Sequence, residues 1–250
     1  MSQGFFKHIP NINYDFKSDG KYYKAKDLFR KVSVWSYLQE SVSGYTYYRI
    51  ADGERPDALA SKLYGDSTLY WTFFLVNENL QDFNDWPMSQ QLLYKFISRK
   101  YSGTVLIAPT TTDIVSHNAS TDVSSKFTLG ETVTQSSSGA TGVVTKIDPT
   151  NNRIILNSIT GIFTIDNSVV GKDSTKSFTV SSVANEKDVA HHYKDVNNLL
   201  TTVSTGNTAV SNEEYEEYER ELNEEKHLIR YIEPKHIGSV IKDFKEIVRD

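Results

Sequence analysis

Residues 44–65 read GYTYYRIADGERPDALASKLYG, and the expected fold is built around this stretch. Over its first seven positions, large apolar residues alternate with smaller or polar ones, which is the period of a half-buried strand. Pro56 stands where the first position of a helix needs no N–H group, and Gly65 supplies a left-handed residue that ends the helix. The sequence therefore predicts a strand over 45–50, a turn at Asp52-Gly53 and a short helix.

Two further helices are expected after this unit. A helix over 68–76 is apolar on nearly all sides, so it must be enclosed by other parts of the chain. A longer helix begins near Ser89 and carries a regular apolar stripe as far as Tyr101. We expect the strand and the three helices to form a compact core over residues 44–108, to which the rest of the chain is attached.

The composition argues against several classes of protein. The chain has 250 residues, a net charge of −5, no cysteine and no cluster of basic residues. Charge-driven binding of nucleic acid is therefore not expected, nor are disulfides, thiolate zinc sites or cysteine nucleophiles. No apolar run approaches the roughly 18 residues that cross a membrane, and the first residues lack a signal-peptide core. We expect a soluble protein that is made in the cytoplasm.

The segment before the core, residues 1–43, is expected to consist of an extended arm and a helix. Alternating apolar residues in the arm stop at Ser18-Asp19-Gly20, and a helix is predicted from Asp27 to about Glu40. An arm with exposed rings either folds back on its own domain or lies on a partner, and both alternatives stay open.

Residues 126–183 have the pattern of a small all-β unit. Runs of four to eight residues, rich in β-branched side chains, are separated by turn residues, which predicts a small barrel or sandwich. The unit reads as an insertion between a polar linker at 109–125 and a polar connector at 184–210. The short apolar run 104–107 is interpreted as a further strand, which can pair with 45–50.

The last segment, residues 184–250, is expected to end in two amphipathic helices. The first is predicted from a capping box at Ser211 and Glu214 to Pro234, where the proline breaks it. The second carries an apolar stripe over 237–248. These helices need each other, the central core or another chain to bury their stripes. The expected fold class is α+β, with a C-terminal helical pair.

No arrangement of residues predicts catalysis or a cofactor. His191 and His192 could bind a metal, but no carboxylate is placed on a defined scaffold beside them, so we interpret the pair as part of a loop packed by ring contacts. A phosphate-binding glycine loop and a Gly-x-Ser-x-Gly elbow are both absent. The glutamates of 213–221 read as the solvated face of a helix. We therefore expect no enzyme, no cofactor and no metal site.

Residues 45–79 resemble a LysM module. The resemblance rests on the strand, the turn and the two helices described above, the second of which ends at Asn77. The chain departs from the module at Glu54-Arg55-Pro56, where a threonine usually follows the turn, and it lacks the usual second strand directly after the asparagine. The resemblance implies a LysM-like core and an alternative function, the binding of peptidoglycan through its N-acetylglucosamine polymer.

A second resemblance covers roughly the first 105 and the last 60 residues. It rests on these motifs: Arg55-Pro56-Asp57-Ala58-Leu59-Ala60, Leu63-Tyr64-Gly65-Asp66, Leu69-Tyr70-Trp71, Asn77-Glu78-Asn79, Trp86, Ser89-Gln90, Lys100-Tyr101, Tyr215, Asn223-Glu224-Glu225-Lys226 and Ile229. The chain is similar to the small baseplate wedge subunit of contractile-tailed phages, which has an embedded LysM-like domain. This resemblance implies a structural protein of the virion, located in the tail baseplate and made in the host cytoplasm.

The same resemblance implies that the protein joins neighbouring wedges. The expected partners are other baseplate wedge proteins and neighbouring copies of the wedge, with no nucleic acid and no membrane; peptidoglycan is the partner under the LysM alternative. We expect aromatic and apolar side chains of the arm and the helices to be buried only in the assembly. The predicted partner-binding residues are Phe5, Phe6, Tyr14, Trp86, Tyr215, Tyr218, Leu222, Ile229, Ile237, Ile241 and Phe244.

Overall fold

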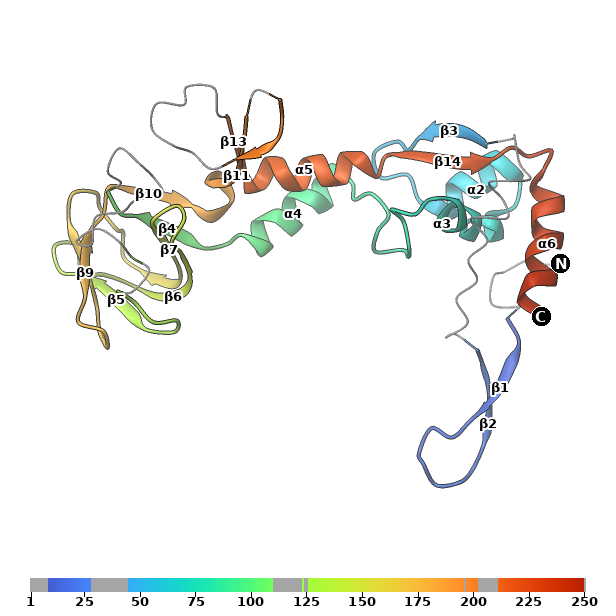
Figure 1. The fold of residues 1–250 in the computed structure, drawn as a ribbon, viewed down its shortest axis with the longest axis horizontal. Coiled ribbons are helices and arrows are strands. Elements are labelled where there is room, and N and C mark those ends of the chain that lie inside the picture. Colours follow the sequence, from blue (N-terminus) through green and yellow to red (C-terminus); the bar gives the residue numbers. More distant parts are fainter. Residues whose placement is uncertain are drawn as a thin grey trace. The chain divides into compact units, whose positions relative to one another are not determined.

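The computed structural model of the chain describes residues 9–27, 45–109, 123, 126–195, 197–201 and 211–249. Phe5, Phe6 and nearly all of the predicted helix from Asp27 to Glu40 lie outside these residues. The chain divides into two compact units, whose elements are labelled in Figure 1: residues 1–91 with 222–250 form the first, and residues 92–221 form the second.

The first unit begins its core with the predicted strand and helix. Strand β3 (Tyr45–Arg49) leads to helix α2 (Pro56–Tyr64), which has proline at its start. Gly65 ends α2 with φ of 72°, and its N–H donates to the Ser61 carbonyl at 2.9 Å. Both predictions are confirmed, because the local signals of proline and glycine agree with the fold around them.

The next predicted helix, over 68–76, is divided into two pieces. The Asp66 carboxylate accepts a hydrogen bond from the N–H of Thr68 at 2.8 Å, and this cap opens only a 3₁₀ turn, η2 (Ser67–Leu69). Helix α3 (Trp71–Val76) then begins two residues later. Its Trp71, Phe73 and Val76 are buried, so the prediction that this segment is enclosed is confirmed.

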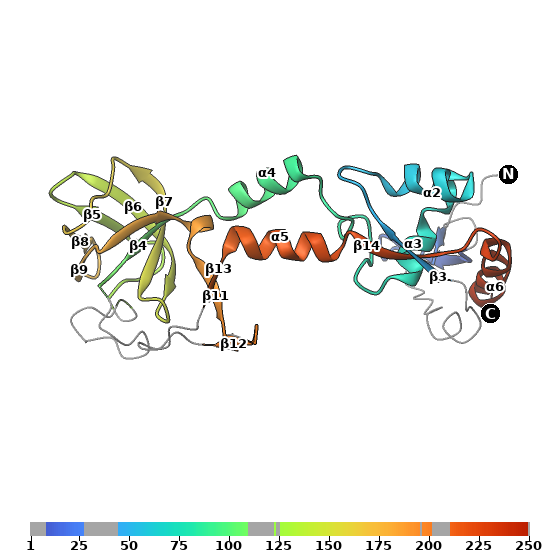
Figure 2. The same ribbon diagram turned by 90° about the horizontal axis from the view of Figure 1, so that it is seen from above.

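A strand from the far end of the sequence pairs with β3. Strand β14 (Leu228–Ile232) runs antiparallel to it, and Figure 2 shows the two strands as labelled ribbons. Leu228 lies opposite Arg49, and Ile232 lies opposite Tyr45. The helix predicted from Ser211 to Pro234 is therefore wrong beyond Glu225. The N–H groups of Lys226 and His227 close a turn onto Asn223 and Glu224, and the apolar run that follows finds a hydrogen-bonding partner in β3.

The apolar stripe of the last helix is covered by this unit itself. Helix α6 (Ile237–Arg249) packs Phe244 against Trp71, with ring centroids 4.6 Å apart. One buried cluster joins α6 to α3 and β14, and a second lies between α2, α3 and β14. The apolar stripe of α6 was expected to pack on the other C-terminal helix, on the central core or on another chain, and packing on the central core is observed. The predicted C-terminal pair of helices is not confirmed, since β14 lies between α5 and α6 in the sequence.

A hairpin stands where an irregular arm was expected. Strands β1 (Asn11–Tyr14) and β2 (Tyr23–Lys26) are antiparallel, with Asn11 opposite Lys26 and Tyr14 opposite Tyr23. The polar residues at 18–20, interpreted as the end of the extended pattern, form part of the turn that reverses the chain.

The second unit is built on one antiparallel sheet. This sheet follows helix α4 (Gln90–Lys100), which starts one residue after the predicted Ser89 and lies mostly in the second unit. Its seven strands lie in the order β10-β4-β7-β6-β5-β8-β9. Their bounds are β4 (Thr104–Ile107), β5 (Thr132–Gln135), β6 (Ala140–Asp148), β7 (Arg153–Thr160), β8 (Ser168–Gly171), β9 (Ser177–Thr179) and β10 (Ser182–Asn185).

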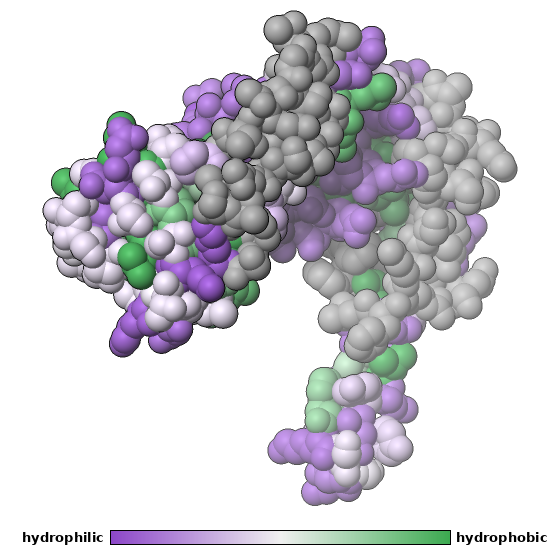
Figure 3. Space-filling view, turned by 60° about the vertical axis from the view of Figure 1, so that its left-hand side comes forward, coloured by the Kyte–Doolittle hydropathy of each residue, from purple (hydrophilic) through white to green (hydrophobic). Residues whose placement is uncertain are grey.

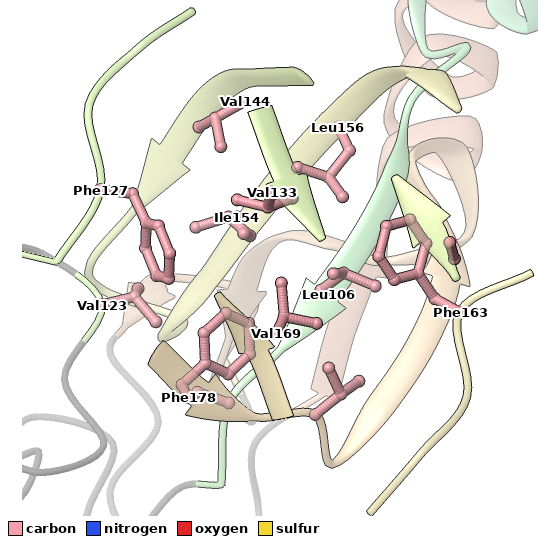
Figure 4. Packing of buried hydrophobic residues seen from close by; sticks show 13 residues of the cluster. Leu106, Val123, Phe127, Val133, Val144, Ile154, Leu156, Phe163, Val169 and Phe178 are labelled. Atoms are coloured by element: carbon pink, nitrogen blue, oxygen red, sulfur yellow. The ribbon is translucent and has the colours of Figure 1, made fainter. Parts of the chain in front are cut away.

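This sheet curls around an apolar interior, so that it forms a half-barrel. Figure 4 shows Val133, Ile154, Leu156 and Phe178 pointing into the same space. The all-β pattern predicted for 126–183 is confirmed. The prediction that 104–107 pairs with 45–50 is wrong: β4 lies between β7 and β10, because its own apolar residues complete the half-barrel core.

The segment predicted as a polar connector at 184–210 also contains strands. After a 3₁₀ turn, η3 (Glu186–Asp188), strand β11 (Ala190–Lys194) pairs with β12 (Leu200–Thr201) and with β13 (Ser211–Glu214). Helix α5 (Tyr215–Glu225) follows directly. The predicted capping box at Ser211 is therefore wrong; those residues pair with Lys194 to Ala190 instead of starting a helix.

Candidate interaction surface

Five of the predicted partner-binding residues are buried in the chain's own packing. Trp86, Tyr215, Ile229, Ile241 and Phe244 each expose less than a tenth of their surface. Ile237, predicted with them, packs partly buried against the cluster of α3 and α6. These side chains stabilise the two units, and the sequence could not distinguish this role from a partner contact because their neighbours lie far away along the chain.

Trp86 shows how such a residue is held. Its indole Nε1 donates to the Glu54 carbonyl at 2.8 Å, and its ring packs on Phe73 and Phe74 at centroid distances of 6.0 and 5.8 Å. The small exposed part of Trp86 helps to line a hollow.

The hollow beside Trp86 has a volume of about 440 Å³ and lies wholly in the first unit. Its walls combine three rings and a proline with the ion pair of Arg55 and Asp57: they are Arg55, Pro56, Asp57, Tyr70, Phe83 and Trp86. The ring of Phe83, 56% exposed, packs on Tyr70 at 5.0 Å. Sequence reasoning missed Phe83, although a phenylalanine within the polar turn 81–85 was a signal.

Three of the predicted residues remain at least partly accessible. Tyr14 lies on the hairpin and is 44% exposed, and Leu222 on α5 is 36% exposed. Tyr218, also on α5, is half-buried because its ring stacks on His191 at 4.1 Å. Tyr14 and Leu222 belong to the first unit, and Tyr218 belongs to the second.

The hairpin carries several exposed aromatic rings close together, whereas only one of them, Tyr14, was predicted to bind a partner. Phe16 packs on Tyr14 at 4.9 Å and on Tyr23 at 6.3 Å. Phe16 is 64% exposed and Tyr23 is 48% exposed, and Tyr22 beside them is exposed as well. Rings of this kind are enriched where proteins contact one another.

The second unit shows no comparable gathering of exposed apolar residues on the face seen in Figure 3. Its hydrophobic residues are scattered there among hydrophilic and intermediate ones. Single exposed apolar side chains such as Leu129 and Ile162 are normal on a protein surface and need no partner.

The histidine pair lies in strand β11, packed by rings. His191 Nδ1 and His192 Nδ1 are 2.8 Å apart, and His191 also meets the edge of Tyr215. Burial lowers the pKa of His191 below its ordinary value of 6.5, and the neighbouring His192 lowers it further. The ring contacts predicted for this pair are observed, although they belong to a strand and not to a loop.

Glu213 on β13 lies beside the pair, with its Oε2 3.3 Å from His192 Nε2 and in an ion pair with Lys194. Within the described ranges, no group of three His, Asp or Glu side chains is arranged to hold a metal ion. In the same part of the chain, no helix is both long and apolar enough to cross a membrane.

Comparison with known proteins places the hairpin and the hollow in a recognised region. The model of the base plate wedge protein 53 family matches residues 1–111. This region matches a family of phage baseplate wedge proteins. It includes β1, β2, β3, α2, α3, α4 and β4, so both exposed features described above lie within it.

Part of the chain is also similar to a curated phage protein. Over 78 residues the chain is 35% identical to the baseplate wedge protein gp53 of Enterobacteria phage T4. The matched residues make up 30% of this chain and 38% of the relative. The chain thus spans well under half of the length of the relative it matches. The predicted resemblance to baseplate wedge subunits of the virion tail is confirmed; neither comparison supports the LysM alternative.

Proposed function

We propose that this protein is a structural component of a phage tail baseplate wedge, which joins neighbouring wedges through protein–protein contacts. The match of residues 1–111 to the base plate wedge protein 53 family carries this proposal. The relative in phage T4 has the same description, which supports the same location in the tail of the virion.

The proposed mechanism is binding, without a chemical reaction. The partners are other baseplate wedge proteins and neighbouring copies of the wedge, and neither nucleic acid nor a membrane takes part. Among the predicted residues, exposed Tyr14 and Leu222 are proposed to contact partners, as are Phe5 and Phe6 in the arm. The buried residues act indirectly, because they hold the exposed surfaces in place.

A phage that carries a stop codon in this gene tests the proposal. Without the chain we expect infected cells to yield no infectious particles and few complete tails in electron micrographs, because wedges are not joined. A plasmid copy of the wild-type chain should restore both, and mass spectrometry should find the chain in purified virions. Complete, infectious virions that lack the chain would rule the proposal out.

A binding assay separates this function from the LysM alternative. The purified chain is sedimented with insoluble peptidoglycan at physiological salt, and we expect it to stay in the supernatant. Specific retention that is lost when exposed residues near Gly53 and Asn77 are changed, such as Glu78→Ala, would instead favour recognition of the sugar polymer.

A further inference from the structure

The two faces of the β1–β2 hairpin differ in chemistry. The pairs Ile12–Ala25 and Tyr14–Tyr23 point to one side, while Asn11–Lys26 and Asn13–Lys24 point to the other, because side chains alternate along paired strands. Phe16, just past β1, extends the first side by packing on both tyrosines. The hairpin therefore has one apolar, aromatic face and one polar, basic face.

The aromatic face has no cover among the described residues. No residue of 11–26 belongs to the buried clusters of the described chain, and Tyr14, Phe16 and Tyr23 are each about half exposed or more. An isolated two-stranded hairpin is only marginally stable in water, and a contact that buries its rings would stabilise it.

The charge that the hairpin offers to a partner is positive. It carries lysines at positions 17, 21 and 24, and also Lys26, whose Nζ donates to the Ile9 carbonyl at 2.7 Å. Its aspartates, in contrast, are engaged by the turn itself. The Asp15 carboxylate accepts from the N–H groups of Lys17, Asp19 and Gly20 at 2.8 to 3.2 Å, and the Asp19 carboxylate accepts from the N–H of Lys21 at 3.0 Å. A groove that takes up the hairpin with the rings toward its floor is therefore apolar at the floor and acidic along the rim, which meets the turn and the edges of the basic face.

We propose that the hairpin docks through Tyr14, Phe16 and Tyr23 into an apolar groove of another baseplate protein, whose rim carries aspartates and glutamates. This inference rests on the proposed function, because it names the surface and the kind of protein partner through which the chain is held in the wedge. The rings supply the apolar contact, and the lysines select the acidic rim and accelerate association.

A photo-crosslinker placed on the hairpin identifies what covers it. The chain with p-benzoylphenylalanine in place of Phe16 is supplied to the phage whose own gene carries a stop codon, and purified virions are irradiated. A chain with the same probe in place of Ile162, which is 80% exposed in the second unit, is the matched control. We expect position 16 to crosslink to one peptide of a different virion protein, next to acidic residues, and position 162 to miss that peptide.

Variants of the two halves of the surface then test its chemistry. The double variant Phe16→Ser/Tyr23→Ser should lower the number of chains per virion at least tenfold. The charge reversal Lys21→Glu/Lys24→Glu should have the same effect. The control Lys21→Arg/Lys24→Arg keeps the charge and should leave this number unchanged. All three should keep the wild-type melting temperature, since the hairpin lies outside the buried cores.

The outcomes separate the two proposals. If the wild-type chain is absent from virions, the proposed function fails, and this inference fails with it. If the chain is present but the hairpin variants assemble normally, only this inference fails. Crosslinks from position 16 to the same chain, to a second copy, to nucleic acid or to lipid would also overturn it.

Discussion

Asn77 holds the backbone of β14 from inside the first unit. Its Nδ2 donates to the carbonyls of Phe73 and Arg230, and its Oδ1 accepts from the N–H of Arg230, all at 2.8 Å. The side chain is buried, so water cannot replace these bonds easily. It therefore links the end of α3 to a strand that lies 153 residues later in the sequence.

We expect Asn77→Ala to lower the free energy of unfolding by about 2–4 kcal/mol, because it leaves buried backbone groups without partners. Urea unfolding followed by circular dichroism measures the change. Asn79→Ala, at an exposed position two residues further on, is the control and should have no measurable effect. Equal stabilities of the two variants would show that the clamp on β14 contributes nothing.

The lowered pKa of His191 predicts that the stability of the second unit depends on pH. Its pKa is lowered in the folded chain, so the unfolded chain binds this proton more tightly. The stability that this group contributes is complete above pH of about 6.5, and it is lost as the pH falls from there toward the lowered pKa of the folded state. The charged groups that face the ring include Lys146 on β6, Glu213 on β13 and Glu219 on α5.

We expect the chain to be less stable to urea at pH 5.5 than at pH 7.5, and His191→Phe to reduce this difference. Phenylalanine retains the stack on Tyr218 but cannot take up a proton. His236→Phe, a change in the first unit, is the comparison and should leave the pH difference as in the wild type. If His191→Phe unfolds with unchanged pH dependence, the histidine is not the group responsible.

Single residues were predictable where their signal is local. Pro56 and Gly65 mark the ends of α2 because the missing N–H and the positive φ act within one turn of helix. The role of Asn77 was not predictable. A polar residue at this position indicates only that the helix ends, and the sequence does not show which strand its side chain binds. The same holds for Ile229 and Phe244, which looked like candidates for a partner.

Among the elements, β14 and α6 complete the first unit. Strand β14 provides the only partner of β3 within the described residues, and α6 covers Trp71 through Phe244. Neither β3 nor α3 has a replacement for these contacts in the neighbouring described sequence.

A chain that ends after Lys226 removes β14 and α6 but keeps α5 whole. We expect hydrogen-exchange protection to be lost over 45–76 and kept over 126–185, because the half-barrel has its own core. A chain that ends after Lys235 retains β14 and should protect β3 better than the shorter chain. Full protection of 45–76 without β14 would contradict this account.

Helices and strands were predictable where the spacing of apolar residues fits either the helical or the strand period, but not both. The short strands of the half-barrel stand out between turns such as 148–152. The run from Leu228 to Ile232 fits both a helical stripe and a strand, and only pairing with β3 decides between them. The polar strands β11 and β13 escaped notice because their residues carry no apolar alternation.

For the whole molecule, the two units have separate cores. The clusters of the first unit contain no residue from 92–221, and the half-barrel cluster contains only residues from within it. We expect a chain in which a long Gly/Ser linker replaces 92–221 to keep hydrogen-exchange protection in β3 and β14. An unfolded first unit in this variant, with the wild-type chain as reference, would show that its stability depends on the inserted residues.

The broad organisation was predictable: an α+β chain with a small β unit after an amino-terminal region that resembles baseplate wedge proteins. Turn spacing and the motifs between Arg55 and Trp86 were sufficient for this. The assembly of one unit from both ends of the sequence was not, because no local pattern tells which distant segment a strand will pair with.

The pairing of β3 with β14 also affects how the chain emerges from the ribosome. Arg230 lies 153 residues after Asn77, so at about 5–20 residues per second it is synthesised roughly 8–30 seconds later. The half-barrel, made from one continuous stretch, can fold during that delay. During this time the apolar side chains of the amino-terminal region are exposed on the nascent chain, and a molecular chaperone can bind them.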